Sequence, residues 1–280
     1  MAEGFIEIPV EKAVGSAWHA EADCVAIEEP LEIRLAEGPA AERTVRCISI
    51  TMRTPGNDCE LAAGFLLSEG IVREPGEIES VRPCGPAIGP RNSHNIVQVD
   101  LHEAVAVDLK RLERHFYTTS SCGVCGKTSL DALAIGAVPE MPHDAPRIKA
   151  GAIHALPEKL RHVQAVFDRT GGLHAAALFD AQGEVLSLRE DVGRHNAVDK
   201  LLGGELLAGR LPLSDRGILV SGRASFELMQ KALMAGIPML AAVGAPSSLA
   251  VELAERFQMT LIGFLRDGRF NVYSGRWRVE

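Results

Sequence analysis

The sequence has 280 residues, of which 46% are hydrophobic and 24% charged, and 29 Lys and Arg stand against 37 Asp and Glu for a formal net charge of −8. This composition is typical of a globular protein with one large or two modest domains, and the acidic balance argues against a general nucleic-acid binder, which would carry a basic face. No apolar run is long enough for a transmembrane helix, and the N-terminal segment lacks the apolar core of a secretory signal, so we expect a cytoplasmic protein that works away from membranes.

The first part of the chain is predicted to be rich in strands. Residues 43–52 and residues 94–101 each alternate apolar and polar side chains, which is typical of a strand with one buried face. Between these segments, residues 60–68 carry apolar side chains at helical spacing. The Pro-Gly turn before that helix leaves Asn57 or Asp58 as the residue that caps it.

A proline-rich stretch, residues 136–146, predicts a domain boundary. We expect a strand-rich N-terminal domain over residues 1–138 and an α/β domain over residues 147–280. In the second domain strand and helix patterns alternate, with strands at residues 173–179, 184–188, 218–221, 239–243 and 260–265, and helices at residues 194–207, 225–234 and 246–256. This order predicts a mixed or parallel sheet that is covered on both faces by helices.

The most informative local feature is the pair Cys122 and Cys125, within Ser-Cys-Gly-Val-Cys-Gly-Lys. In a reducing compartment, a close pair of this kind is more often redox-active, metal-binding or catalytic than a structural disulfide. Lys127 and a helix-start pattern at residues 128–131 both favour the thiolate form. The small neighbours leave the sulfur atoms accessible, so the pair suits thiolate attack or carriage of a sulfur atom as a persulfide.

A structural zinc site is the main alternative for this pair. One C-x-x-C motif supplies two of the four ligands that zinc needs, so a second pair is required. Cys84, His94 or His115 could contribute, but none of them repeats a zinc-ligand spacing. A thioredoxin-like site is also disfavoured, because the pair does not follow a short N-terminal βαβ unit. We therefore expect no bound metal.

A zinc deaminase would combine H-x-E with P-C-x-x-C. His19-Ala20-Glu21 matches the first motif, but Ser121 stands where the second requires proline, and His19 lies far upstream of the cysteines. We interpret His19 as an exposed polar residue near the end of the chain.

Polar residues are unusually dense at residues 190–200, where a strand is predicted to turn into a helix. Open α/β sheets bind ligands at such turns, at the carboxyl ends of their strands. The helix start and Arg194 could bind an anion, and His195 and Asp199 could share a helix face. The simpler interpretation is that Asp191 caps the helix and the rest is a solvated or interface surface. Because a cap needs only one of these residues, we favour a binding role for Arg194 and His195.

Small and basic residues also follow the later strands. Ser221 and Arg223 lie in the turn after the next predicted strand, residues 245–248 follow the one after, and residues 264–269 end the last one with two arginines around an Asp-Gly turn. Together these turns predict one pocket for a phosphorylated ligand. The sequence has no P-loop motif, so ATP hydrolysis of that type is not indicated.

These motifs resemble the FdhD family, the formate dehydrogenase accessory sulfurtransferases. The resemblance is carried, in order, by residues 52–56 (Met-Arg-Thr-Pro-Gly), 121–127, 170–176, 190–200, 221–227 and 264–273. The chain departs from the family in two places: it has Asn57-Asp58-Cys59-Glu60 where the family often has His-Asp-Glu-Glu, and Gly244 where the family often has Ser. The first departure leaves any role of residue 57 open.

The resemblance implies a homodimeric carrier that receives sulfur from a cysteine desulfurase. It would pass the sulfur to the molybdenum or tungsten bis-molybdopterin guanine dinucleotide cofactor before the cofactor enters formate dehydrogenase. In the family the first cysteine of the pair carries the persulfide, which is Cys122 here, while Cys125 assists. The loop after the last central strand binds the guanine dinucleotide, for which GDP is an analogue, and in this chain it consists of Phe264, Leu265, Arg266, Asp267, Gly268 and Arg269. The second domain is expected to be a three-layer α/β/α domain that resembles the cytidine-deaminase-like fold without the deaminase zinc motif.

The sequence is compatible with two functions. The leading one is a sulfurtransferase that also holds the cofactor. The other is a non-catalytic chaperone of the cofactor or of the apo-dehydrogenase, in which the C-x-x-C motif has a structural role.

Overall fold

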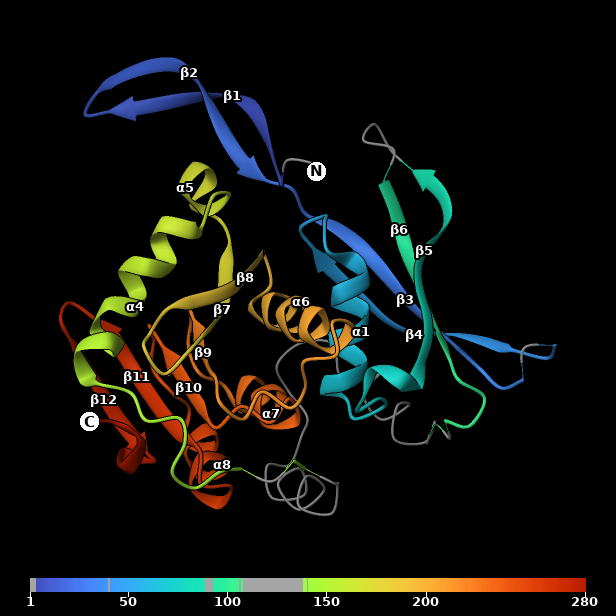
Figure 1. Cartoon of the computed structure of the whole chain (residues 1–280). Helices are drawn as coiled ribbons and strands as arrows, with labels where there is room; N and C mark the ends of the chain where they lie inside the picture. Colours follow the sequence, from blue (N-terminus) through green and yellow to red (C-terminus); the bar gives the residue numbers. More distant parts are fainter. Residues whose placement is uncertain (1–3, 40, 89–92, 106, 108–137, 140) are drawn as a thin grey trace.

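The computed structural model describes residues 4–39, 41–88, 93–105, 107, 138–139 and 141–280. These residues form a mixed α/β structure with three β-sheets: a two-stranded hairpin, a four-stranded sheet and a six-stranded sheet (Figure 1). None of the described helices has both the length and the apolar character needed to cross a membrane.

The four-stranded sheet has the order β4-β3-β6-β5 and belongs to the N-terminal half. Its strands are β3 (Glu29–Glu37), β4 (Thr44–Arg53), β5 (Ile78–Ile88) and β6 (Ser93–Leu101), and helix α1 (Asp58–Ser68) follows β4. Alternate residues of β3 and β6, such as Leu31, Ile33 and Val97, are buried in the core that α1 also joins. The predictions of strands at residues 43–52 and 94–101, and of a helix at residues 60–68, are confirmed.

The start of α1 differs from the predicted cap. Asn57 occupies the N-cap position with a φ of 58°, and no side chain caps the helix. Asparagine tolerates a left-handed conformation better than most residues do. Asn57 therefore contributes its backbone conformation to the start of the helix, and its side-chain amide does not cap it. The carboxylate of Asp58 instead accepts two hydrogen bonds of 2.9 Å from the buried Arg53.

The six-stranded sheet has the order β12-β11-β10-β9-β7-β8 and is mixed, as predicted. Strands β9 (Gly217–Val220), β10 (Met239–Ala242) and β11 (Thr260–Arg266) are parallel, whereas β7 (His174–Phe179), β8 (Val185–Asp191) and β12 (Arg269–Ser274) pair antiparallel. Helices α6 (Arg194–Leu207), α7 (Phe226–Met234) and α8 (Ser248–Arg256) share one core with one face of this sheet. Helix α4 (Ala150–Val163) contributes Ile153, Leu156 and Leu160 to a second core on the other face. The three-layer arrangement expected for this half is therefore present, while the likeness to cytidine deaminases stays a prediction.

Helix α4 and strand β12 were not predicted from the sequence. Helix α4 carries Gly151 near its start and Pro157 inside it, and both residues usually break helices. Its start at Lys149 has no capping side chain. Packing of Ile153, Leu156 and Leu160 against the sheet outweighs these unfavourable local signals.

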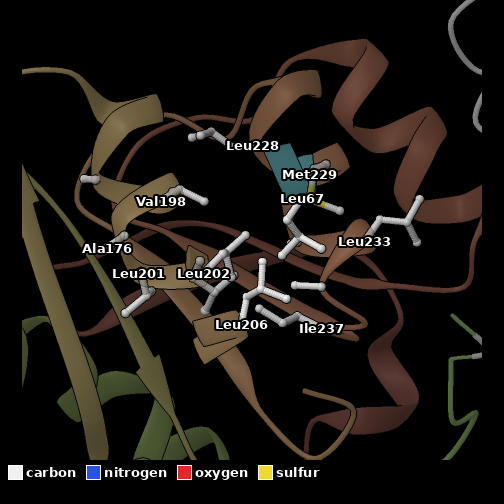
Figure 2. Close-up of a cluster of buried hydrophobic side chains, with 14 of the residues drawn as sticks. Leu67, Ala176, Val198, Leu201, Leu202, Leu206, Leu228, Met229, Leu233 and Ile237 are labelled. Carbon is white, nitrogen blue, oxygen red and sulfur yellow. The ribbon is translucent and has the colours of Figure 1, made fainter. Parts of the chain in front are cut away.

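The two larger sheets share one hydrophobic core, in which helix α1 crosses helix α6 (Figure 1). A Cβ atom at Gly64 of α1 would lie 1.8 Å from the carbonyl oxygen of Asp199, and one at Gly203 of α6 would lie 1.8 Å from that of Glu60. Only glycine allows the two backbones to approach this closely. Leu67 of α1 packs within the leucine-rich cluster that surrounds α6 (Figure 2). The expected division at residues 136–146 stays a prediction, but the core is continuous across the two halves.

The hairpin of β1 (Phe5–Val14) and β2 (Ala17–Ala26) projects away from both larger sheets (Figure 1). Most of its side chains are exposed, and Trp18 near the turn is 67% exposed. His19 lies exposed on β2, which agrees with its interpretation as a surface residue.

Candidate functional site

The cysteine pair lies outside the described residues, and so do Lys127 and His115. Of the cysteines that the structure describes, Cys24, Cys47, Cys59 and Cys84 all have free thiols. Across the described ranges, no group of three or more His, Cys, Asp or Glu side chains is arranged to hold a metal ion. The predicted site residues that the structure describes lie at the ends of the central strands and at the start of α6.

The ends of β9, β10 and β11 are joined into one row, which we call the loop edge (residues 221–225, 243–247 and 264–269). The backbone N–H of Gly244 donates to Gly222 at 2.9 Å, and that of Phe264 donates to Gly244 at 3.0 Å. Ala224 likewise donates to Ala245 at 3.1 Å. The three turns therefore continue the sheet beyond its strands and hold one another in place.

Close approach at the loop edge depends on glycine. A Cβ atom at Gly244 would lie 3.0 Å from the carbonyl oxygen of Gly222 and 3.1 Å from atoms of Arg223. The serine that the family often carries at this position would need its neighbours to move by a few tenths of an ångström. A Cβ atom at Gly222 would lie 3.5 Å from Nδ1 of His174 and 3.9 Å from Cδ of Arg194, so these two side chains flank the same turn.

The last predicted loop, residues 264–269, is a tight β-hairpin. A β-bulge between Gly263 and Arg266 puts Phe264 in the left-handed region, with a φ of 53°. Asp267 and Gly268 both have positive φ, which makes the two-residue turn that joins β11 to β12. Strand β11 thus extends further than predicted.

The bulge decides which residues of this hairpin can meet a ligand. It adds one residue to β11, so that Leu265 lies on the same face of the sheet as Ile262. Both side chains belong to the core that α4 also joins. The side chain of Leu265 is 1% exposed and contributes to packing rather than to a binding surface. Phe264 is half-buried, and the other four residues are exposed, namely Arg266, Asp267, Gly268 and Arg269.

The polar stretch at residues 190–200 is divided between two roles. Four of its residues are buried and bonded to the N-terminal half, and we call this contact the joint (Asp191, Asn196, Asp199, Lys200 and their partners). The ammonium of Lys200 lies 2.7 Å from the carboxylate of Asp191 and donates to the carbonyl oxygen of Thr54 at 2.7 Å. Asp191 also accepts a bond from the backbone N–H of Thr54 at 3.1 Å.

The other two buried residues complete the joint in the same way. The amide of Asn196 donates to the carbonyl oxygen of Met52 at 2.7 Å. The carboxylate of Asp199 lies 2.8 Å from Lys231 of α7 and accepts a bond of 2.6 Å from Ser68 of α1. A solvated surface was therefore wrong for Asn196, Asp199 and Lys200, which bond to the N-terminal half and form an interface with it.

Arg194 and His195 differ from their neighbours in the same stretch. The Nε atom of Arg194 and the Nε2 atom of His195 are buried and have no hydrogen-bond partner among the described residues. Burial lowers the pKa of His195 to about 4, with help from the positive charges of Lys231 and Arg194. At neutral pH this imidazole is uncharged, and a buried donor without a partner is costly unless a ligand satisfies it.

Two residues at this place were missed in the sequence. Burial, followed by the charge of Arg194, lowers the pKa of His174, which begins β7. Glu227 of α7 lies within electrostatic range of both Arg194 and His195, and its pKa is lowered although burial alone would raise it. His174 lies within residues 170–176, which carry part of the family resemblance, but only the pairing of β7 with β9 places it beside Gly222.

Ser221 and Arg223 have different surroundings. The hydroxyl oxygen of Ser221 accepts a bond of 2.9 Å from the backbone N–H of Ala175, so it holds β9 against β7. Arg223 is exposed at the turn between β9 and α7. The loop edge therefore presents exposed arginines beside two neutral, half-buried histidines, an arrangement that suits an anionic ligand with several phosphate groups.

Comparison with known proteins gives concordant matches. The model of the FdhD/NarQ family matches residues 26–280. The sulfur carrier protein FdhD of Streptomyces avermitilis is 54% identical over 92% of this chain and 89% of its own length. Those of Mycolicibacterium paratuberculosis and Saccharolobus solfataricus are 51% and 41% identical, over 93% and 92% of both chains respectively.

One solved structure is similar along its whole length. It is a crystal structure of a protein from Desulfotalea psychrophila described as a formate dehydrogenase accessory protein, with a TM-score of 0.72 over 99% of each chain. At 24% sequence identity, this likeness supports the fold alone.

Proposed function

Because this chain belongs to the FdhD/NarQ family, we propose that it is a sulfur carrier that serves formate dehydrogenase. Cys122 takes sulfur from a cysteine desulfurase as a persulfide. The protein then passes this sulfur to a molybdenum or tungsten bis-molybdopterin guanine dinucleotide, which it binds as a substrate at the loop edge. The observation that carries the proposal is the match to relatives named sulfur carrier protein FdhD over nine-tenths of the chain, together with the C-x-x-C motif of this sequence.

Sulfur loading on Cys122 is a thiol exchange. The thiolate of Cys122 attacks the outer sulfur of the donor's persulfide, a new S–S bond forms, and the donor leaves as a thiolate. No electrons are gained or lost overall. Cys125 assists release of the sulfur without carrying it, and a homodimer would present two such sites.

Mass spectrometry after incubation with a desulfurase and free cysteine tests this step. We expect Cys122 to gain the mass of one sulfur atom. Cys122→Ala should abolish both loading and activation of formate dehydrogenase, whereas Cys125→Ala should be milder. Full activation by Cys122→Ala would contradict the proposal and favour a non-catalytic chaperone. A larger loss in Cys125→Ala would exchange the roles of the two cysteines.

Binding of the nucleotide part is supported by the exposed β11–β12 turn. Arg266 and Arg269 face each other across the two-residue turn, and both side chains are exposed. The carboxylate of Asp267 can accept hydrogen bonds from the N1 and N2 groups of guanine. In calorimetry with GDP, Arg266→Ala and Arg269→Ala should each weaken binding by about 1.5–3 kcal/mol, the value of a charge-assisted hydrogen bond.

The same variants separate nucleotide binding from sulfur loading. Loading of Cys122 should persist in both, because it precedes contact with the cofactor. Unchanged GDP binding in the double variant would show that the nucleotide site lies elsewhere.

A further inference from the structure

His174 and Arg194 come together at the turn at Gly222 from different elements, and His195 follows Arg194 directly in the chain. Arg194 and His195 begin α6, and His174 begins β7. A Cβ atom at Gly222 would touch both His174 and Arg194, so these two side chains flank the same backbone, and the charge of Arg194 also acts on His195. The buried Nε of Arg194 and Nε2 of His195 have no partner among the described residues. Polar atoms left unpaired in this way indicate a ligand that carries hydrogen-bond acceptors.

The charges around this cluster nearly cancel when no ligand is bound. His174 is faced by Arg194 from α6 and by Asp191 from β8. Asp191 already pairs with Lys200 inside the joint. The positive guanidinium of Arg194 is thus the main charge beside the imidazole of His174.

The second imidazole has a similar balance. His195 is faced by Arg194 and Asp199 of its own helix, and by Glu227 and Lys231 of α7. Asp199 and Lys231 pair with each other at 2.8 Å. Arg194 and Glu227 then remain as opposite charges, so the fixed charges alone offer little net attraction for a phosphate. The two imidazoles are the groups that can supply more positive charge.

We propose that His174, Arg194 and His195 bind one phosphate group of the nucleotide and that the two imidazoles take up protons from solvent when it binds. This inference rests on the proposed nucleotide site at the loop edge and names the residues that bind its phosphate. Guanine recognition stays at the β11–β12 turn, on the other side of the row of strand ends. Nothing is oxidised or reduced, since protons move from buffer to imidazole nitrogen atoms.

The physical reason is electrostatic linkage. Burial and the guanidinium of Arg194 keep both imidazoles neutral in the free protein. The terminal phosphate of GDP, with nearly two negative charges, favours the protonated imidazoles and so opposes both effects. Binding must then strengthen as the pH falls from 8 to 6.5, a range in which most of the phosphate is still doubly charged.

The test is calorimetric titration of the whole protein with GDP at pH 7, in two buffers with different ionisation enthalpies. The difference in heat gives the number of protons taken up. We expect about half a proton or more per GDP, and an affinity about fivefold higher at pH 6.5 than at pH 8. Guanosine, which lacks phosphate, should show no uptake. Zero uptake with GDP, or equal uptake with guanosine, would overturn the inference without touching the nucleotide site itself.

Variants identify the groups that take up protons. The His174→Asn/His195→Asn double variant should lose most of the uptake and the pH dependence, while each single variant should lose part of them. His162→Asn, on the exposed side of α4, is the matched control and should behave as the wild type. Unchanged uptake in a folded double variant would assign the protons to other residues. The wild-type measurements with GDP and guanosine decide the inference even if the double variant does not fold.

Inorganic pyrophosphate separates this inference from the function on which it rests. If pyrophosphate binds with proton uptake and GDP does not bind, the phosphate site stands and the guanine dinucleotide proposal falls. If neither ligand binds, both are wrong.

Discussion

The joint and the loop edge use the same kinds of residues in opposite ways. In the joint, Asp191, Asp199, Lys200 and Lys231 are buried and each has a charged partner within 3 Å. A few residues away, the Nε atom of Arg194 and the Nε2 atom of His195 are buried without any partner in the described part of the chain. One short stretch therefore both fastens the two sheets together and leaves donors for a ligand. Density of polar residues alone does not distinguish the two roles, but the presence of a partner does.

This contrast predicts that variants of the joint lose stability and that variants of the loop edge lose ligand binding instead. The largest effect is expected for Lys200→Met, which keeps most of the side-chain volume but leaves the carboxylate of Asp191 buried and uncompensated. Loss of one partner from a buried pair costs about 3–5 kcal/mol. Urea denaturation measures this as a fall in the free energy of unfolding. The control is Lys12→Met on the hairpin, whose exposed pair with Glu21 contributes at most about 1 kcal/mol. Equal losses in the two variants would contradict the role of the joint.

The next effect concerns the helix crossing beside the joint. Gly64→Ala places a methyl group against the carbonyl oxygen of Asp199. That oxygen belongs to the backbone of α6, and the methyl carbon is bonded directly to the backbone of α1, so neither can move aside alone. We expect the two helices to move slightly apart and the free energy of unfolding to fall by about 3 kcal/mol, the upper part of the range for overpacking. Thermal unfolding tests this against Gly151→Ala of α4, where nothing lies within 4 Å of the new methyl group. The control should be stabilised slightly, because alanine favours helix. A neutral Gly64→Ala would mean that the helices can move apart freely.

A smaller, pH-dependent effect is expected at the boundary between the two regions. The pKa of His195 is about 4 in the folded protein and about 6.5 in an unfolded chain. The unfolded state therefore binds more protons between these values, so stability is complete above pH 6.5 and falls as the pH decreases towards 4. Between pH 7 and pH 5 the wild type should lose about 1–2 kcal/mol more than His195→Gln. If the free energy of unfolding of the wild type and of His195→Gln fell equally with pH, folding would not hold the imidazole of His195 neutral.

The smallest effect on stability is expected at the exposed part of the loop edge. Arg223→Ala removes an exposed side chain whose charge no described residue pairs within 4 Å. Its free energy of unfolding should stay within about 0.5 kcal/mol of the wild type. GDP binding should nevertheless weaken severalfold, since the lost guanidinium is a phosphate donor. A variant that is destabilised but binds GDP normally would reverse the contrast between the two regions.

Much of the second half was predictable because its strands and helices are locally regular. Helix α6 begins and ends at the predicted residues, and β7, β9, β10 and β11 lie within a few residues of their predicted positions. Their apolar runs are bounded by glycine, proline and serine turns, which are strong local signals. The resemblance of the motifs to one family was confirmed by the family match over residues 26–280. The roles of Cys122 and Cys125 stay predictions, because both lie outside the described residues.

The sequence alone determined most of the central strands and helices, the motifs and the family, since each depends on residues that are close in the chain. Only the tertiary structure decided which polar residues were free. Lys200 finds Asp191 and Thr54, Asp199 finds Ser68 and Lys231, and His174 comes to lie beside Arg194. Apart from Asp191, these partners are 20 or more residues away in the sequence, and pairing at such separation leaves no periodic signal. A bulge of one residue likewise moved Leu265 from the expected binding loop into the core, because side chains alternate faces along a strand and one extra residue reverses them.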